Sequence, residues 1–302
     1  MRILVTGRDG QIASSLRELV PRAGHEVVAL GRDALDLAGD PAAIKRAIVD
    51  AGPEVVVSAA AYTAVDQAES DREAARAVNV RGAEAVAAAA QLLGVPLLHL
   101  STDYVFDGRK EAPYVETDPT CPTSVYGETK RDGEEAVIRC YDNVAILRTA
   151  WVYSPFGNNF VKTMLRLANE KDEIAVVGDQ VGNPTSALDI ANGLLAIAGN
   201  MVGSDGPVLR GIFHMTAVGS ASWAEFAEAI FEASEQSGGP TARVRHIATS
   251  EYPTAAKRPA NSRLDCAKLE RTHGVRLPHW KSSLKPIVER LVAQRGQEQG
   301  DD

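Results

Sequence analysis

Short apolar runs alternate with longer amphipathic stretches through the first half of the chain. The runs predict strands at residues 2–7, 25–30, 54–60, 96–102 and 144–153. Between them, apolar residues recur at helical spacing and predict helices at residues 11–24, 41–52, 72–94 and 125–140. Apolar strands that alternate with helices are typical of a parallel sheet covered on both faces. The pattern therefore predicts an α/β fold with a doubly wound parallel sheet.

The pattern is less regular after residue 153. It predicts helices at residues 158–170, 185–199 and 222–234, and a strand at residues 211–217. Ser222 stands three residues before Glu225, the spacing of a capping box. We therefore expect a sheet domain at residues 1–150 and a smaller C-terminal lobe at residues 151–302, with segments around 185–217 returning to the sheet domain. The polar tail, residues 293–302, is expected to fray.

Composition narrows the class of protein. Forty acidic against 32 basic residues give a formal net charge of −8, which argues against general affinity for nucleic acid or an anionic membrane. Every apolar stretch is shorter than the ~18 residues that a membrane span needs, and the first one is too short for a signal peptide. Three cysteines, Cys121, Cys140 and Cys266, lack CxxC spacing. They favour reduced thiols, a cytoplasmic protein and no zinc site.

A glycine turn follows the first predicted strand. Gly7, Gly10 and Ala13 form a G-x-x-G-x-x-A pattern between that strand and the next helix. The first glycine permits a tight turn, the second lets the backbone approach a pyrophosphate, and the third small residue lets the helix pack on the strand. The N-terminus of the helix would then face the phosphates. The motif therefore predicts a Rossmann-like domain that binds NAD or NADP.

The end of the second predicted strand bears on which dinucleotide is bound. An acidic residue there would bind the ribose 2′-hydroxyl of NAD, whereas an arginine would accommodate the 2′-phosphate of NADP. The chain has Arg32 at this place, followed by Asp33, and Asp36 lies further on, where it could approach the adenine. A solvated surface charge is the other interpretation of Arg32. We expect NADPH, with NADH possible.

The segment TSVYGETK places Tyr126 four residues before Lys130. On a helix these positions share a face, so a phenol and an ammonium can point at one ligand. The ordinary pKa of a phenol is near ~10, and a nearby ammonium lowers it. Upstream, Ser101 and Thr102 end a predicted strand, at the edge of the sheet where ligands bind. Tyr126 is therefore a candidate proton donor in an acid–base reaction.

The glycine turn, the strand-end hydroxyls and the Y-x-x-x-K pair occur in this order in the extended short-chain dehydrogenase/reductase superfamily, which the chain resembles. The blocks STDYVFDG, PTSVYGETKRDGE, LRTAWVY, GNPTSALDIA and RPANSRLD resemble the dTDP-4-dehydrorhamnose reductases within it. The first block is specific to this family, and the resemblance covers nearly the whole chain. It implies an NAD(P)H-dependent oxidoreductase that reduces the C4 keto group of dTDP-4-dehydro-L-rhamnose, the final step of dTDP-L-rhamnose biosynthesis.

The resemblance also implies roles for particular residues. Thr102 would polarise the C4 carbonyl, Tyr126 would donate the proton, and Lys130 would lower the pKa of Tyr126 and hold the nicotinamide ribose. Asp103 and Trp151 would contact the sugar. The further cofactor contacts that it implies are Gly10, Gln11 and Ile12 at the pyrophosphate, Asp36 and Leu37 at the adenosine, and Ala61, Tyr62 and Thr63 at the middle of the dinucleotide.

Several of these residues have a second interpretation. Ser101 could replace Thr102 as the polarising hydroxyl, and Trp151 could belong to the core. Arg258 and Arg263 have side chains suited to a nucleotide diphosphate, but a salt bridge would use them equally well.

The chain departs from the family pattern at two positions. Some members of the family dimerise through a metal ion held by glutamates, and one such position is Ser15 here, which argues against bound Mg²⁺ and leaves a monomer or a homodimer. The third motif position is Ala13, which the pattern tolerates.

Two alternative functions remain open from the sequence. One is another sugar-nucleotide 4-ketoreductase or epimerase, and the other is a non-catalytic NADP-binding subunit like the regulatory one of methionine adenosyltransferase. The presence of Thr102, Tyr126 and Lys130 together favours an enzyme.

Overall fold

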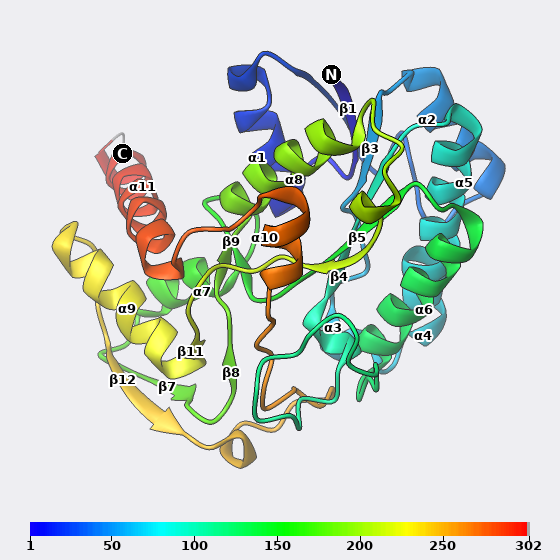
Figure 1. The fold of residues 1–302 in the computed structure, drawn as a ribbon. Coiled ribbons are helices and arrows are strands. Elements are labelled where there is room, and N and C mark those ends of the chain that lie inside the picture. Colours follow the sequence, from blue (N-terminus) through cyan, green and yellow to red (C-terminus); the bar gives the residue numbers. More distant parts are fainter. Residues whose placement is uncertain (301–302) are drawn as a thin grey trace.

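A six-stranded sheet forms the centre of the molecule (Figure 1). The structure, a computed structural model, describes residues 1–300 and the side chains of residues 1–294. The sheet order is β10-β5-β4-β3-β1-β2, and every neighbouring pair is parallel. Its strands are β1 (Arg2–Thr6), β2 (Glu26–Leu30), β3 (Val55–Ser58), β4 (Leu97–Thr102), β5 (Val144–Thr149) and β10 (Gly211–His214). The predicted α/β fold with a doubly wound parallel sheet is confirmed.

Helices cover both faces of the sheet because successive strand residues point to opposite sides. Ile3 and Val5 belong to a core shared with one pair of helices, whereas Leu4 belongs to a core shared with the others. The first face carries α1 (Gln11–Leu19) and α8 (Ala187–Met201), which pack against each other. The second face carries α2 (Pro41–Ala51), α5 (Ala83–Leu93) and α6 (Val125–Cys140).

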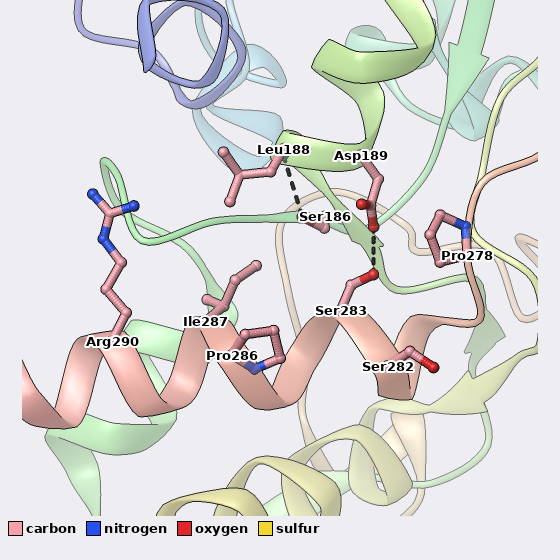
Figure 2. A pocket seen from close by; sticks show the side chains of 9 residues that line it. All are labelled: Ser186, Leu188, Asp189, Pro278, Ser282, Ser283, Pro286, Ile287 and Arg290. Atoms are coloured by element: carbon pink, nitrogen blue, oxygen red, sulfur yellow. Dashed lines mark hydrogen bonds between the residues drawn. The ribbon is translucent and has the colours of Figure 1, made fainter. Parts of the chain in front are cut away.

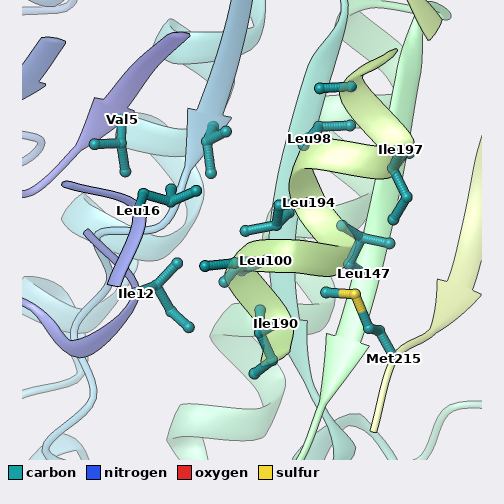
Figure 3. Packing of buried hydrophobic residues seen from close by; sticks show 14 of the residues in the cluster. Val5, Ile12, Leu16, Leu98, Leu100, Leu147, Ile190, Leu194, Ile197 and Met215 are labelled. Atoms are coloured by element: carbon teal, nitrogen blue, oxygen red, sulfur yellow. The ribbon is translucent and has the colours of Figure 1, made fainter. Parts of the chain in front are cut away.

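The core under α1 and α8 is shown in Figure 3. Leu98 and Leu100 of β4 and Leu147 of β5 lie in one buried cluster with Ile190 and Leu194 of α8. Burial of each such side chain stabilises the fold by about 1.5–3 kcal/mol. The carboxyl ends of β4 and β5 are therefore held on a packed base.

Short helices connect the strands on the second face. They are α3 (Val65–Ala68), α4 (Arg72–Arg76), the π-helix η2 (Ala77–Gly82) and the 3₁₀ turn η3 (Asp103–Val105). A further short helix, η1 (Pro21–Ala23), follows α1 and packs against it. The helix predicted at residues 72–94 is thus continuous in space but is made of α4, η2 and α5. π-helical turns often mark functional sites, and η2 lies against α6.

A smaller lobe follows the carboxyl end of β5 and has its own buried apolar cluster. Its longer elements are α7 (Phe160–Leu167), β7 (Glu173–Val177), α9 (Trp223–Gln236), β12 (Arg243–Ile247) and α11 (Trp280–Gly300). Its short elements are β6 (Val152–Tyr153), β8 (Val181–Gly182), β9 (Thr185–Ser186), β11 (Ala221–Ser222) and η5 (Thr249–Glu251). Two further elements, η4 (Pro207–Leu209) and α10 (Ala267–His273), pack on the sheet domain instead. The capping box of Ser222 and Glu225 begins α9 as predicted.

Several boundaries differ from the sequence predictions. The strand predicted at residues 144–153 is broken into β5 and β6 because Trp151 adopts a left-handed φ of 49°. The predicted helix at residues 11–24 ends at Leu19 and continues as η1. The C-terminal helix α11 reaches Gly300, through most of the tail that was expected to fray, and residues 301–302 lie outside the described part. Within residues 1–300, none of the helices has the length and apolar composition of a membrane span.

Candidate active site

The glycine turn leaves the N-terminus of α1 open. Gly7 has a left-handed φ of 89°, which a glycine adopts without strain, and its N–H donates to the Leu30 carbonyl at 2.8 Å. A Cβ added to Gly10 would meet no protein atom within 4 Å. The turn therefore leaves room above the first backbone N–H groups of the helix, as binding of a pyrophosphate requires.

Gln11 and Ile12 can serve the pyrophosphate mainly through their backbone. The Ile12 side chain is buried in the core under α1 (Figure 3). The Gln11 amide donates to the Val152 carbonyl at 3.2 Å and accepts from the Ser154 hydroxyl at 2.8 Å. The Gln11 side chain thus connects the glycine turn to the loop after β6.

The adenosine end carries an arginine that the sequence interpretation did not single out. Arg8 lies in the glycine turn, and its guanidinium donates to Asp33 at 3.1 Å. A Cβ on Gly31, at the end of β2, would lie 2.7 Å from the Asp33 carboxylate and 3.0 Å from the Arg8 guanidinium carbon. Arg32 is 84% exposed and lies 3.6 Å from Asp36. Two arginines, rather than one, therefore lie beside the carboxylates that follow β2.

The other predicted adenosine contact, Leu37, is buried, so its backbone is the part that remains available. Its carbonyl oxygen lies against η2, where a Cβ on Gly82 would be 2.5 Å away. Only a glycine allows this close approach.

The segment Ala61, Tyr62 and Thr63 follows β3 and is tied to the helix that carries Tyr126. The Tyr62 N–H donates to the Asn79 amide oxygen at 2.8 Å, and the Asn79 amide nitrogen donates back to the Tyr62 carbonyl at 3.2 Å. The same nitrogen donates to the Thr129 hydroxyl at 3.1 Å. Asn79, in η2, thus fixes the predicted cofactor loop relative to α6.

At the end of β4 the two candidate hydroxyls have different partners. The Ser101 hydroxyl donates to the buried Glu134 carboxylate. The Thr102 hydroxyl donates to Asp103 at 3.0 Å and accepts from the Tyr104 N–H at 3.2 Å, so it caps η3. It also lies near enough to the Tyr126 phenol to influence the pKa of that group. Of the two, Thr102 is the hydroxyl that faces Tyr126.

Helix α6 brings Tyr126 close to η3. The Tyr126 and Tyr104 rings meet edge to face, with centroids 5.5 Å apart and planes at 74°. Ser124 caps the helix by accepting from the Gly127 N–H at 3.2 Å. A Cβ on Gly127 would lie 2.1 Å from the Tyr104 carbonyl oxygen. The glycine after Tyr126 is therefore required for the helix to approach the segment that carries Thr102.

The titrating groups here are shifted mainly by burial. Burial raises the pKa of Tyr126 above its ordinary value, and the nearby Thr102 hydroxyl opposes the shift. Burial raises the pKa of Asp103 to about 6. It lowers the pKa of Lys130 to about 8, and the Glu134 charge opposes this. The Lys130 ammonium donates to the Leu100 carbonyl at 2.7 Å. The pKa of Tyr126 is therefore raised, whereas from the sequence we expected Lys130 to lower it.

Trp151 stacks on Trp223 rather than standing alone. The ring centroids are 3.5 Å apart and the planes differ by 9°. A Cβ on Gly182 would lie 2.5 Å from the Trp151 ring, so the glycine makes room for it. Trp151 is partly buried, and Trp223 lines a pocket of about 620 Å³.

That pocket lies mostly in the smaller lobe and reaches Tyr104, whose ring contacts the Tyr126 ring. Tyr104 and Arg258 line it, with Phe160, Trp223 and Tyr252 among the aromatic residues around it. The Arg258 guanidinium donates to the Tyr104 hydroxyl at 3.3 Å and to Asp66 at 2.5 Å.

Arg263 lies elsewhere. It donates to the Asn261 side-chain oxygen at 2.8 Å and to the Glu111 carbonyl. The structure thus brings one of the two candidate arginines, Arg258, to the pocket, while Arg263 holds two loops together.

Comparison with known proteins agrees with this geometry. The family model described as the RmlD substrate binding domain matches residues 1–293. The chain belongs to this family. The dTDP-4-dehydrorhamnose reductase of Sinorhizobium fredii is 52% identical over 294 residues, which cover 97% of this chain and 99% of that protein.

Solved structures of the family superpose closely on this fold. The dTDP-4-dehydrorhamnose reductase ortholog from Clostridium acetobutylicum is 38% identical, with a TM-score of 0.89 over 96% of this chain and 99% of that one. The reductase from Bacillus anthracis, solved in complex with NADP, is 34% identical, with a TM-score of 0.88 over 95% of this chain and 98% of that one.

A second pocket, of about 440 Å³, lies between α8 and α11 and holds none of the predicted site residues (Figure 2). There the Ser283 hydroxyl donates to Asp189 at 2.5 Å. Arg290, also at this pocket, pairs with Glu18 of α1 at 2.8 Å. These contacts join α11 to the sheet domain.

Among the residues that the structure describes, no group of three or more His, Cys, Asp or Glu side chains could hold a metal ion. Ser15, at the position where some family members have a metal-binding glutamate, is buried and donates to the Gln11 carbonyl at 2.8 Å.

Proposed function

We propose that this protein catalyses the NAD(P)H-dependent reduction of the C4 keto group of dTDP-4-dehydro-L-rhamnose to dTDP-L-rhamnose. The observation that carries the proposal is the meeting of Thr102, Tyr126 and Lys130 at the carboxyl end of β4, in a chain 52% identical to a dTDP-4-dehydrorhamnose reductase. This edge of a doubly wound sheet is where ligands bind.

The residues at the glycine turn fit a dinucleotide. The open space at Gly10 and the free N-terminus of α1 support a pyrophosphate there, and the loop at Ala61, Tyr62 and Thr63 would lie along the middle of the dinucleotide. When bound, the nicotinamide supplies the hydride. Arg8 and Arg32 together favour NADPH, while Asp33 offers a carboxylate to the ribose of NADH.

Three side chains would handle the carbonyl oxygen and its proton. Thr102 donates a hydrogen bond that orients the C4 carbonyl, and Tyr126 gives its proton to the oxygen as the alkoxide forms. Because burial raises the pKa of Tyr126, the phenol remains protonated until the alkoxide develops. Lys130 holds the nicotinamide ribose and stabilises the phenolate that is left.

The smaller lobe would hold the rest of the substrate. Arg258, beside Tyr104, presents a planar guanidinium suited to the diphosphate. Asp103 and the Trp151–Trp223 stack would contact the sugar. Residues 1–150 with the returning segments around 185–217 would then bind the cofactor, and most of residues 151–302 the nucleotide sugar.

The assembly and location follow the same proposal. Buried Ser15 supports a monomer or homodimer that needs no metal bridge. The free thiols of Cys121, Cys140 and Cys266 support the cytoplasm.

The direct test is an assay of purified protein with NADPH and dTDP-4-dehydro-L-rhamnose. The proposal predicts loss of one NADPH per sugar reduced and dTDP-L-rhamnose as the product identified by NMR. An epimerase would change the sugar without net loss of NADPH. A regulatory subunit would bind NADPH without turnover. Either result would overturn the proposal.

A further inference from the structure

A buried ion pair lies behind the predicted catalytic residues. Glu134 of α6 and Arg148 of β5 face each other with side chains only 3% exposed. Arg148 donates to the two carboxylate oxygens at 2.9 Å and 2.6 Å. The Ser101 hydroxyl donates to the same carboxylate. A carboxylate with three charge-assisted or hydroxyl donors is held in one orientation.

The position of this pair relates it to the reaction. Glu134 stands four residues after Lys130, so both side chains share one face of α6. Ser101 immediately precedes Thr102 and lies opposite Arg148 in the pairing of β4 with β5. Arg148 is itself held, because its guanidinium lies 5.1 Å above the Phe106 ring. The pair therefore joins the helix of Tyr126 and Lys130 to the strand of Thr102.

We propose that Glu134 is a positioning residue of the reduction, which fixes α6 on the strand of Thr102 and whose negative charge keeps the buried Lys130 ammonium protonated. This inference rests on the proposed function, since it assigns Lys130 to the cofactor ribose and to the Tyr126 phenolate. It gives a reason for a buried charge one helical turn from the Y-x-x-x-K pair.

The charges around Lys130 agree with this role. Lys130 is buried, and burial lowers its pKa to about 8, while the Glu134 charge raises it. From β4, the Leu100 carbonyl accepts from the ammonium and the buried His99 faces it; burial, together with the Lys130 charge, lowers the pKa of that imidazole. From η3, Asp103 faces Tyr126.

The remaining charged groups on α6 point away from this cluster. Glu128 pairs with Arg72 of α4 at 2.9 Å and Asp132 with Arg76 of α4 at 2.7 Å. Arg131 pairs with Asp132 at 2.7 Å and lies 3.9 Å from Glu135, and all of these side chains are at least 20% exposed. From β5, Arg148 is occupied by Glu134. Removal of the Glu134 charge therefore leaves both Lys130 and Arg148 buried without this counter-charge, and Lys130 is the one that can lose its proton.

The test compares Glu134→Gln, Glu134→Asp and the matched control Glu135→Gln, an exposed neighbour on the same helix. The affinity for NADPH is measured from pH 6 to pH 10 by fluorescence, and kcat is measured over the same range. We expect the alkaline midpoint of both curves to fall by about one pH unit in Glu134→Gln. Glu134→Asp, which keeps the charge but shortens the side chain, should lose thermal stability yet retain the wild-type midpoint.

Equal midpoints for Glu134→Gln and Glu135→Gln would overturn the proposal, as would an equal shift in Glu134→Asp. If Glu134→Gln does not fold, the double variant Glu134→Gln/Arg148→Met, which removes both buried charges, is measured in its place. A smaller fall in the same direction is then expected, and an unchanged midpoint overturns the role. The binding curve needs no substrate, so it tests Glu134 even if the wild-type protein fails to reduce the sugar, a result that would count against the proposed function alone.

Discussion

Gly127 lies so close to Tyr104 that a single added carbon would overlap the backbone: a Cβ would be 2.1 Å from the Tyr104 carbonyl oxygen. This contact sets how near the helix of Tyr126 comes to the strand end of Thr102. The spacing of the two catalytic candidates therefore depends on a residue without a side chain.

Gly127→Ala is predicted to separate α6 from η3. Overpacking of this kind costs about 1–3 kcal/mol of unfolding free energy, and the displacement of Tyr126 should lower kcat more than it raises KM. Urea denaturation and steady-state kinetics measure the two effects. The matched control is Gly199→Ala in α8, where an added Cβ meets no atom within 4 Å. That variant should be as stable as the wild type or more so; similar losses in both variants would contradict the account.

Tyr126→Phe removes the proposed proton without changing the ring. NADPH affinity should be preserved while kcat falls by about 10²–10⁴-fold, the range for loss of a general acid. Lys130→Met should lower both the affinity for NADPH and kcat, because Lys130 is assigned to the nicotinamide ribose and to the Tyr126 phenol. Stopped-flow kinetics and NADPH titration separate the two cases. A near-normal kcat for Tyr126→Phe would remove it from the role of proton donor.

Arg8→Gln is predicted to change cofactor preference. Loss of a guanidinium at the 2′-phosphate should weaken NADP⁺ binding by at least about tenfold, the equivalent of about 1.4 kcal/mol, and leave NAD⁺ binding unchanged. Asp33→Asn should weaken NAD⁺ instead. Calorimetric titration of both dinucleotides gives the result, with Arg22→Gln, an exposed arginine on η1, as the control. An effect confined to Arg32→Gln would assign the 2′-phosphate to Arg32.

The buried His214 should make the free energy of unfolding depend on pH. Burial, aided by the Arg148 charge, lowers its pKa to about 3, below the ordinary 6.5. Between these two pH values the unfolded chain binds a proton at His214 that the folded protein does not bind. The contribution of His214 to the free energy of unfolding is therefore fully present above pH 6.5 and is lost as the pH falls. Asp103, with a raised pKa of about 6, acts in the opposite direction between pH 3.8 and 6.

His214→Asn keeps a donor near the Tyr114 carbonyl but does not titrate. Denaturation curves between pH 7 and pH 4 should therefore show a shallower loss of stability for His214→Asn than for the wild type, by at most about 1.4 kcal/mol per pH unit. Identical slopes would show that His214 is not the group responsible.

The sequence predicted the parts of the fold that depend on local pattern. Apolar strands and helical spacing identified all six strands of the sheet, because buried parallel strands are apolar throughout. The pattern did not identify β12, whose residues Arg243–Ile247 are mostly exposed, or α11, which contains Pro286. The sequence interpretation also joined β5 and β6 into one strand, because nothing in the sequence around Trp151 indicates a left-handed φ.

The site followed the same division. Spacing singled out Gly10, Tyr126 and Lys130, and the resemblance to the reductases implied Thr102 with Ser101 as its alternative. Asn79, Arg8 and Glu134 were missed because their importance arises from contacts between segments far apart in sequence. The contact with Glu134, which occupies the Ser101 hydroxyl, likewise could not be seen in the sequence.

The central claim, reduction at C4 with Tyr126 as the acid, is tested most directly by isotope transfer. NADPH carrying deuterium in the transferable position at nicotinamide C4 is incubated with dTDP-4-dehydro-L-rhamnose, and the product is examined by NMR. The account predicts dTDP-L-rhamnose with one deuterium at C4 of the sugar, formed by the wild type and almost absent with Tyr126→Phe. Deuterium retained on the cofactor, or a product labelled at another carbon, would contradict it.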